Sequence, residues 1–219
     1  MQNEMLQVLG KPALAGRYVA RKLQQLQNSG NEPLTRASLA RLRRGLGKPP
    51  GSMPDLWDLT LEGMPQELAG FDGQPSWGEW AIHLALTLFA LHQQGKNWKT
   101  DGMNKPGQAL GKAARQLVKN EDDMARVKRR FDQAITSDSP QEVARHLRSL
   151  VQLLRASGIA LDYPALAEDL YRYQIPEARD GVRLKWGRDF FAATFTNQSP
   201  NAPEIEDDLT ESEEMDHDE

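Results

Sequence analysis

The side chains best suited to chemistry are arginines and lysines gathered in segments that lack carboxylates. Two such segments lie between Leu34 and Pro54 and between Met103 and Asn120, and they hold Arg36, Arg41, Arg43, Arg44 and Lys48, then Lys105, Lys112, Arg115 and Lys119. Like charges held together repel, so such segments usually have an anionic partner. A guanidinium group suits phosphate because it stays charged and donates paired hydrogen bonds. The pattern predicts a polyanion partner, with ordinary solvated helix faces as the alternative.

The C-terminal residues carry a net negative charge, whereas the rest of the chain carries a net positive charge. Residues 200–219 hold ten carboxylates and no Lys or Arg. The other 199 residues hold all 27 basic side chains against 21 of the 31 acidic ones, a net charge of +6. The chain as a whole carries −4, so its acidity belongs to this tail. The tail has too little apolar content to fold, and we expect it to be disordered.

The patterns of common catalytic sites are not matched. Gly107–Ala113 is similar to a phosphate-binding loop, but it has one residue too few between its glycines and no Ser or Thr after Lys112. His83 and His92 have no carboxylate at ligand spacing, so we predict no metal site. The acids of Glu121–Asp123 suit a helix start, where the helix dipole favours them, better than a nuclease centre. We therefore predict a non-enzymatic protein without metal or cofactor, although a triad assembled in space leaves no such pattern.

Nearly every periodic segment is typical of a helix, and no alternating run of β-branched residues indicates a strand. The pattern predicts an all-α protein with helices near residues 12–28, 35–46, 54–62, 76–93, 108–119, 122–135, 140–156, 164–173 and 182–194. The helix over 76–93 is apolar on almost every side, so we expect it to be buried at the centre of a bundle. Two lobes are predicted, joined by a connector and followed by the tail: residues 1–95, 96–107, 108–199 and 200–219.

The predicted helix over 140–156 separates apolar from basic residues. Ser139 is a candidate N-cap, with Pro140 in the first turn and Glu142 placed to reach back to the cap. One side of the helix is apolar, and the opposite side carries Arg145, Arg148, Gln152 and Arg155. The preceding helix adds Arg126, Lys128, Arg129 and Arg130.

Several features point to a cytoplasmic protein. The chain has no cysteine, which excludes disulfides and suits a reducing compartment. Its N-terminus lacks the charged and apolar regions of a signal peptide. The most apolar stretch, Ile82–Leu91, is about half the length that spans a bilayer. We expect a soluble protein with no membrane partner.

Eight short motifs, in order and at matching spacing, resemble the CasB family, the small subunit of the type I-E CRISPR surveillance complex, Cascade. The resemblance runs from about Arg36 to Phe191, and its motifs are Leu39–Gly45, Gln108–Ala113, Arg129–Phe131, Asp138, His146–Leu150, Leu161–Pro164, Asp169–Tyr171 and Trp186–Phe191. The first thirty residues match only in being helical, and the acidic tail is not part of the family pattern.

The resemblance implies a helical, two-lobed, non-enzymatic protein that packs head to tail with a second copy along the complex. Members of this family bind guide RNA and target DNA through their backbones and help hold the displaced non-target strand. They thereby stabilise the R-loop, and a separate helicase–nuclease cleaves the DNA. Exchange of a DNA duplex for an RNA–DNA heteroduplex is nearly balanced, so backbone contacts can tip it.

The resemblance also implies nucleic-acid-binding residues. It assigns an N-terminal arginine pair, a lysine after a Leu-Gly step and three arginines of the C-terminal lobe: Arg43, Arg44, Lys112, Arg129, Arg130 and Arg148. Helical spacing alone adds Arg41, Arg115, Arg126 and Arg145. Three more basic residues are candidates to extend this surface: Arg183, Lys185 and Arg188. Arg188 is next to Asp189, so these two side chains are also a candidate internal ion pair.

Two other classes of function remain open at this point. A stand-alone helical DNA-binding regulator would place residues 35–46 in the major groove and prefer a palindromic site. A protein-only scaffold would pair its arginines with acidic partners and show no salt-dependent binding of DNA.

The acidic tail suggests autoinhibition, with a merely solubilising role as the alternative. If the tail covers the basic surface as a phosphate mimic, removal of residues 200–219 will raise the affinity for DNA at low salt, where charge interactions are least screened. Titration of labelled DNA into the full-length and shortened chains measures this. Equal affinities of the full-length and shortened chains for DNA would exclude a tail that covers the basic surface.

Overall fold

The structure, a computed structural model, describes residues 2–98 and 100–196. Within them the predicted all-α class is confirmed, with helices α1 (Gln2–Asn28), α2 (Glu32–Arg44), α3 (Trp57–Thr60), α4 (Trp77–His92), α5 (Leu110–Arg115), α6 (Glu121–Ile135), α7 (Pro140–Ser157), α8 (Tyr163–Tyr173) and α9 (Pro176–Thr196). Short 3₁₀ helices cover Pro54–Leu56 and Gln66–Leu68. The β pairing in these residues is one isolated bridge, Asn104 with Leu161. The predicted acidic tail lies outside the described residues.

The helix α4 occupies the centre of the fold. Every residue from Ala81 to His92 is buried, as its apolar pattern predicts. The helices α1, α2, α7 and α8 all pack against it. A capping box fixes its start: the Ser76 hydroxyl accepts from the Glu79 amide at 3.0 Å, and the Glu79 carboxylate accepts from the Ser76 amide at 2.7 Å.

Polar groups on α4 find partners within the core. The Nε2 atom of His83 lies 3.0 Å from the Gly45 carbonyl oxygen, and the Thr87 hydroxyl donates to the His83 carbonyl at 2.8 Å. The Nδ1 atom of His92 lies 2.8 Å from the Tyr163 hydroxyl on α8. Burial lowers the pKa of His83, and it lowers the pKa of His92 to about 4. Each histidine therefore makes one side-chain hydrogen bond inside the core, while His83 Nδ1 and His92 Nε2 are buried without a hydrogen-bond partner among the described residues.

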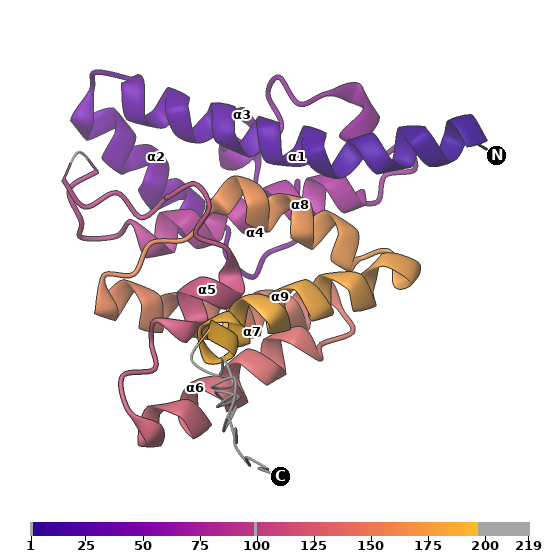
Figure 1. The fold of residues 1–219 in the computed structure, drawn as a ribbon. Coiled ribbons are helices and arrows are strands. Elements are labelled where there is room, and N and C mark those ends of the chain that lie inside the picture. Colours follow the sequence, from indigo (N-terminus) through magenta and orange to yellow (C-terminus); the bar gives the residue numbers. More distant parts are fainter. Residues whose placement is uncertain (1, 99, 197–219) are drawn as a thin grey trace, which may run out of the picture.

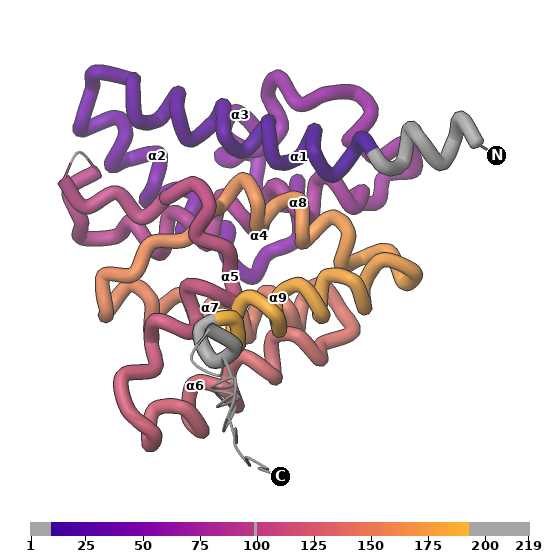
Figure 2. The backbone as a smooth tube through the Cα atoms, viewed as in Figure 1, coloured from indigo at the N-terminus to yellow at the C-terminus, as the bar shows by residue number. Residues whose placement is uncertain are grey.

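The helix α8 joins the two halves of the chain. It packs more extensively on α1 and α4 than on α9, and Figure 1 shows it between α1 and α9. The helix α8 is far from α1 in the sequence, as their orange and indigo colours in Figure 2 show. One hydrophobic cluster accordingly contains residues from both predicted lobes. The division into lobes at residues 95 and 108 remains a prediction.

Close packing and a buried carboxylate hold α9 in place. A Cβ atom at Gly111 would lie 2.2 Å from the Trp186 carbonyl oxygen, so only glycine permits the approach of α5 to α9. The buried Asp169 of α8 accepts hydrogen bonds from Lys185 Nζ at 2.6 Å and from the Trp186 indole at 2.7 Å. Both partners belong to α9, so Asp169 ties α8 to α9.

Several helix boundaries differ from the predictions, and those of α1, α5 and α9 differ most. The helix α1 begins upstream of Pro12, because a proline inside a helix removes one hydrogen bond without ending a segment of strong helix formers. The helix α5 is shorter, since the Gln108 carbonyl accepts from the Asp162 amide at 2.8 Å and Ala109 is extended. The helix α9 begins earlier, at Pro176, a residue type suited to a first turn.

The N-cap of α7 is confirmed. The Ser139 hydroxyl accepts from the Glu142 amide at 3.2 Å. The Glu142 side chain does not complete a capping box; its carboxylate lies 3.9 Å from the Arg145 guanidinium.

We predict that Asp169→Ala lowers the free energy of unfolding by about 2–3 kcal/mol, because it leaves the buried Trp186 N–H without an acceptor. Urea denaturation measures the change. Asp132→Ala is the matched control, since it removes only an exposed pair with Lys128 and should cost less than about 1 kcal/mol. Equal losses for the two variants would contradict this role of Asp169.

We predict that stability falls as the pH drops from about 6.5 to 4. The unfolded chain gains a proton at His92 in this range, whereas the folded chain, with its lowered pKa, does not. The effect of His92 can reach about 3 kcal/mol at the acid end. Urea denaturation at several pH values should give a flatter profile for His92→Gln than for the parent chain. Parallel profiles would show that the His92 proton is not coupled to folding.

Candidate nucleic-acid interface

Three basic side chains come together where α2, α4 and α7 end. Arg43 lies in the last turn of α2, Arg155 in the last turn of α7, and Lys96 follows α4. Burial and the nearby charge of Arg155 both lower the pKa of Arg43. The charges of Lys96 and Arg155 both contribute to the lowered pKa of His92, after burial. We call Arg43, Lys96 and Arg155 the junction cluster.

Packing on α4 and the helix dipoles explain why these cations are held together. Both α2 and α7 pack against α4, and the charge of Arg155 in the last turn of α7 acts on Arg43 in the last turn of α2. The C-terminal end of a helix carries partial negative charge and favours a cation such as Arg43 or Arg155. Arg155 is also oriented by a 2.9 Å hydrogen bond from its guanidinium to the side-chain oxygen of Gln94.

The junction cluster has no carboxylate partner in the part of the chain that the structure describes. The half-buried Arg43 side chain makes neither a hydrogen bond nor an ion pair there, and the Arg155 guanidinium bonds only to the neutral Gln94. Like charges at partly buried positions repel more strongly than fully hydrated ones, because the local dielectric constant is lower. A bound anion would remove this repulsion.

The basic side of α7 leads away from the junction cluster. Val143, Leu147 and Leu154 are buried, whereas Arg145 and Arg148 are exposed on the opposite side with Gln152. Arg148 makes no ion pair with any described residue, whereas Arg145 lies 3.9 Å from Glu142. The predicted stripe of α7 is therefore present, and it continues the positive surface of the cluster.

The α5–α6 region supplies a second group of cations. Lys112 and Arg129 are exposed, and within residues 2–98 and 100–196 neither forms an ion pair. Arg115 Nε and Arg130 Nη1 are buried and, in the same part of the chain, have no hydrogen-bond acceptor. A buried donor without an acceptor is unfavourable, and an anion is one ligand that would satisfy it.

Two arginines of α2 already have acidic partners. Arg44 pairs with the Asp55 carboxylate at 2.6 Å. Arg41 pairs with Asp58 and also donates to the Asp55 carbonyl oxygen, so it helps to hold α3 against α2. Exposed ion pairs contribute little free energy, so these contacts do not prevent an exchange for phosphate. Arg126 is similar, since it pairs with Asp123 one turn away. The roles of all ten predicted residues in binding remain predictions.

Two predicted extensions of the surface serve the fold. Arg183 donates to the Ile135 carbonyl at 2.7 Å and lies 3.3 Å from Asp138, and Lys185 binds the buried Asp169. Arg188 forms no ion pair with Asp189 within the described residues. Arg183 and Lys185 are therefore not part of the basic surface, whereas Lys96 and Arg155 are. Arg155 was detectable on the basic stripe of the sequence, whereas Lys96 had no such signal.

Metal and membrane sites find no support in the described part of the chain. It contains no group of three His, Asp or Glu side chains arranged to hold a metal ion. None of the helices in this part is long and apolar enough to cross a membrane.

Known proteins resemble this chain in sequence and in structure. Residues 38–191 match the family described as CRISPR-associated protein Cse2. The crystal structure of CasB from Thermobifida fusca is 34% identical, with a TM-score of 0.68 over 81% of this chain and 97% of that chain. A Cse2-family CRISPR-associated protein from Thermus thermophilus is 26% identical, with a TM-score of 0.60 over 81% and 97% of the two chains.

A third solved structure, CasB from M. ruber, shares the fold. It is 23% identical, with a TM-score of 0.58 over 86% of this chain and 98% of that chain. No curated protein matches the chain. The family match covers most of the chain, and the T. fusca protein exceeds 30% identity over four-fifths of it. The chain therefore belongs to the CRISPR-associated Cse2 family, which includes the CasB proteins.

Proposed function

We propose that this protein is a non-enzymatic subunit of Cascade that stabilises the R-loop by binding the backbones of guide RNA, target DNA and the displaced non-target strand. Membership of the Cse2 family supports the coarser part of this statement, a CRISPR-associated Cascade subunit. One observation supports the finer part: Arg43, Arg148 and Arg155 stand at exposed or half-buried positions of α2 and α7 and have no carboxylate partner among the described residues.

The form of the basic surface favours contact with phosphates over contact with bases. Arg43, Arg148 and Arg155 project from helices whose opposite sides are buried, so their positions are fixed by the core. Contacts of arginine with phosphate position a nucleic acid without reading its sequence. A complex programmed by its guide RNA needs such sequence-tolerant binding, since base pairing supplies the specificity.

The proposal includes partners and a compartment. They are the nucleic-acid strands of the R-loop, the other Cascade subunits and a second copy of this protein, in the cytoplasm. A stand-alone regulator that inserts α2 into a major groove receives less support, because the family match and the similar CasB structure favour a Cascade subunit.

We predict that the purified chain binds unrelated oligonucleotides without sequence preference and with a steep dependence on salt. Each phosphate contact contributes about −0.9 for duplex DNA, or about −0.7 for a single strand, to the slope of log K against log salt concentration. The triple variant Arg43→Gln, Arg148→Gln, Arg155→Gln should therefore flatten the slope by about 2–3 and weaken binding most at low salt. Fluorescence anisotropy across a salt series measures both quantities.

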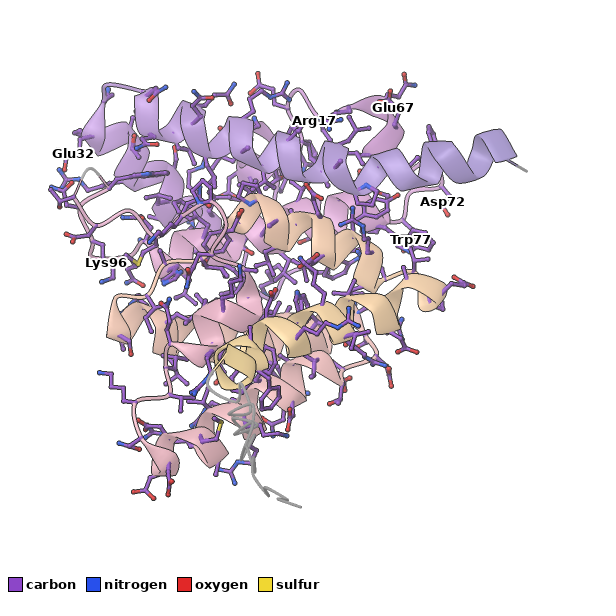
Figure 3. The ribbon with its side chains drawn as sticks, viewed as in Figure 1. Arg17, Glu32, Glu67, Asp72, Trp77 and Lys96 are labelled. Atoms are coloured by element: carbon purple, nitrogen blue, oxygen red, sulfur yellow. The ribbon has the colours of Figure 1, made fainter. Side chains whose placement is uncertain are left out.

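A double variant, Lys11→Gln with Arg17→Gln, controls for a general loss of positive charge, although it removes two charges and the triple variant removes three. Both residues are on α1, and Figure 3 shows Arg17 far from Lys96 of the junction cluster. This control should retain nearly the parental slope. A strong sequence preference would favour the regulator. Equal slopes for the triple variant and the control would contradict a phosphate-binding role of the α2–α7 surface, and an absence of any salt-dependent binding would favour the scaffold.

A further inference from the structure

Trp57 is an exposed aromatic residue whose orientation is fixed. It is the first residue of α3, and 49% of its surface is exposed. Its indole N–H donates to the Gly51 carbonyl at 2.9 Å. This bond uses the only hydrogen-bond donor of the side chain and holds the ring in one orientation. The exposed part of Trp57 is therefore a preorganised aromatic surface without an unsatisfied polar atom.

Arginines of α2 pair with acidic residues that are close to Trp57 in the sequence. Asp55, two positions before Trp57, binds Arg44 at 2.6 Å, and Asp58, the next residue after it, binds Arg41. The loop that accepts the indole hydrogen bond begins just after Lys48, which is exposed. Trp57 is thus held at the cationic end of α2, the same helix end that carries Arg43 of the junction cluster.

Other aromatic residues do not share this setting. Trp98 of the predicted connector packs inward, with its ring centroid 4.9 Å from that of Phe89. Trp77 is exposed but has an edge-on contact with Tyr171, with centroids 6.2 Å apart. Phe71 is 85% exposed, and its neighbour Asp72 lies at the opposite end of the molecule from Lys96 in Figure 3. Among the exposed aromatic residues of residues 2–98 and 100–196, Trp57 is the one whose sequence neighbours Asp55 and Asp58 pair with arginines of α2.

We propose that Trp57 is a stacking platform for one unpaired base of a single-stranded nucleic acid, with the α2 cations on the flanking phosphates. This inference rests on the proposed function and adds a preference for single strands to it. Stacking accepts any base, because every base has a π face, and it therefore suits a guide-programmed complex. A base within a duplex is already stacked and paired, so the platform contributes nothing to duplex binding.

The test compares Trp57→Ala with Phe71→Ala on three probes: a single-stranded DNA, the same strand with abasic sites, and its duplex. Removal of an aromatic platform costs about 1–3 kcal/mol per base, so Trp57→Ala should weaken single-strand binding between about 5-fold and 150-fold. The salt slope should not change, because no phosphate contact is lost. Binding of the duplex and of the abasic strand should be the same as for the parent chain. Phe71→Ala should behave as the parent with all three probes.

A conservative variant separates stacking from folding. Trp57→Phe keeps an aromatic face and should recover most of the affinity that Trp57→Ala loses, and thermal unfolding of each variant checks the fold. Equal losses of affinity on the single strand, abasic strand and duplex would overturn the platform, as would a Trp57→Ala variant that binds the single strand normally. If that variant instead loses co-purification with other Cascade subunits, Trp57 is a protein-docking residue.

The result also distinguishes the two proposals. Salt-dependent binding that is unaffected by Trp57→Ala would overturn the platform and leave the R-loop proposal intact. A parent chain that binds none of the probes would contradict both.

Discussion

The burial of α4 on all sides is the constraint on which the rest of the structure depends. A helix that is apolar around most of its circumference is unstable in water unless other helices cover each of its sides. The helices α1, α2, α7 and α8 provide this cover, and the polar groups of His83, Thr87 and His92 bond within the core. The positions of the surrounding helices follow from this single requirement.

The same requirement creates the basic surface. The helices α2 and α7 both pack on α4, and the arginines of their last turns, Arg43 and Arg155, are within the range of charge interaction. Packing of the apolar sides thus supplies the free energy that holds like charges together. The pairing of Arg183 with Asp138 and of Lys185 with Asp169 keeps other cations within the fold. Positive charge without a carboxylate partner among the described residues therefore remains at the ends of α2, α4 and α7 and in the α5–α6 region.

Local patterns in the sequence predicted the local features well. The apolar circumference of α4, the Ser139 cap and the two-sided α7 all depend on residues close in the chain, and the structure confirms them. Contacts between distant residues were not predictable in this way. The packing of α8 on α1, the proximity of Arg43 to Arg155 and the internal pairs of Arg183 depend on how helices are arranged in space. Helical period places a residue on a side of its own helix, but it does not say which helix faces that side.

The late position of α8 in the chain has a consequence for biosynthesis. The helices α1 and α4 both use α8 as a neighbour, yet ribosomes complete α8 only after all residues up to Tyr173 have been joined. Until then one apolar side of α4 has no cover, and the nascent chain exposes it to chaperones and to other chains. Closure of this core joins residues far apart in sequence, which slows folding relative to a bundle of successive hairpins. In the interval between the synthesis of α4 and that of α8, association of the exposed apolar side with other chains competes with folding.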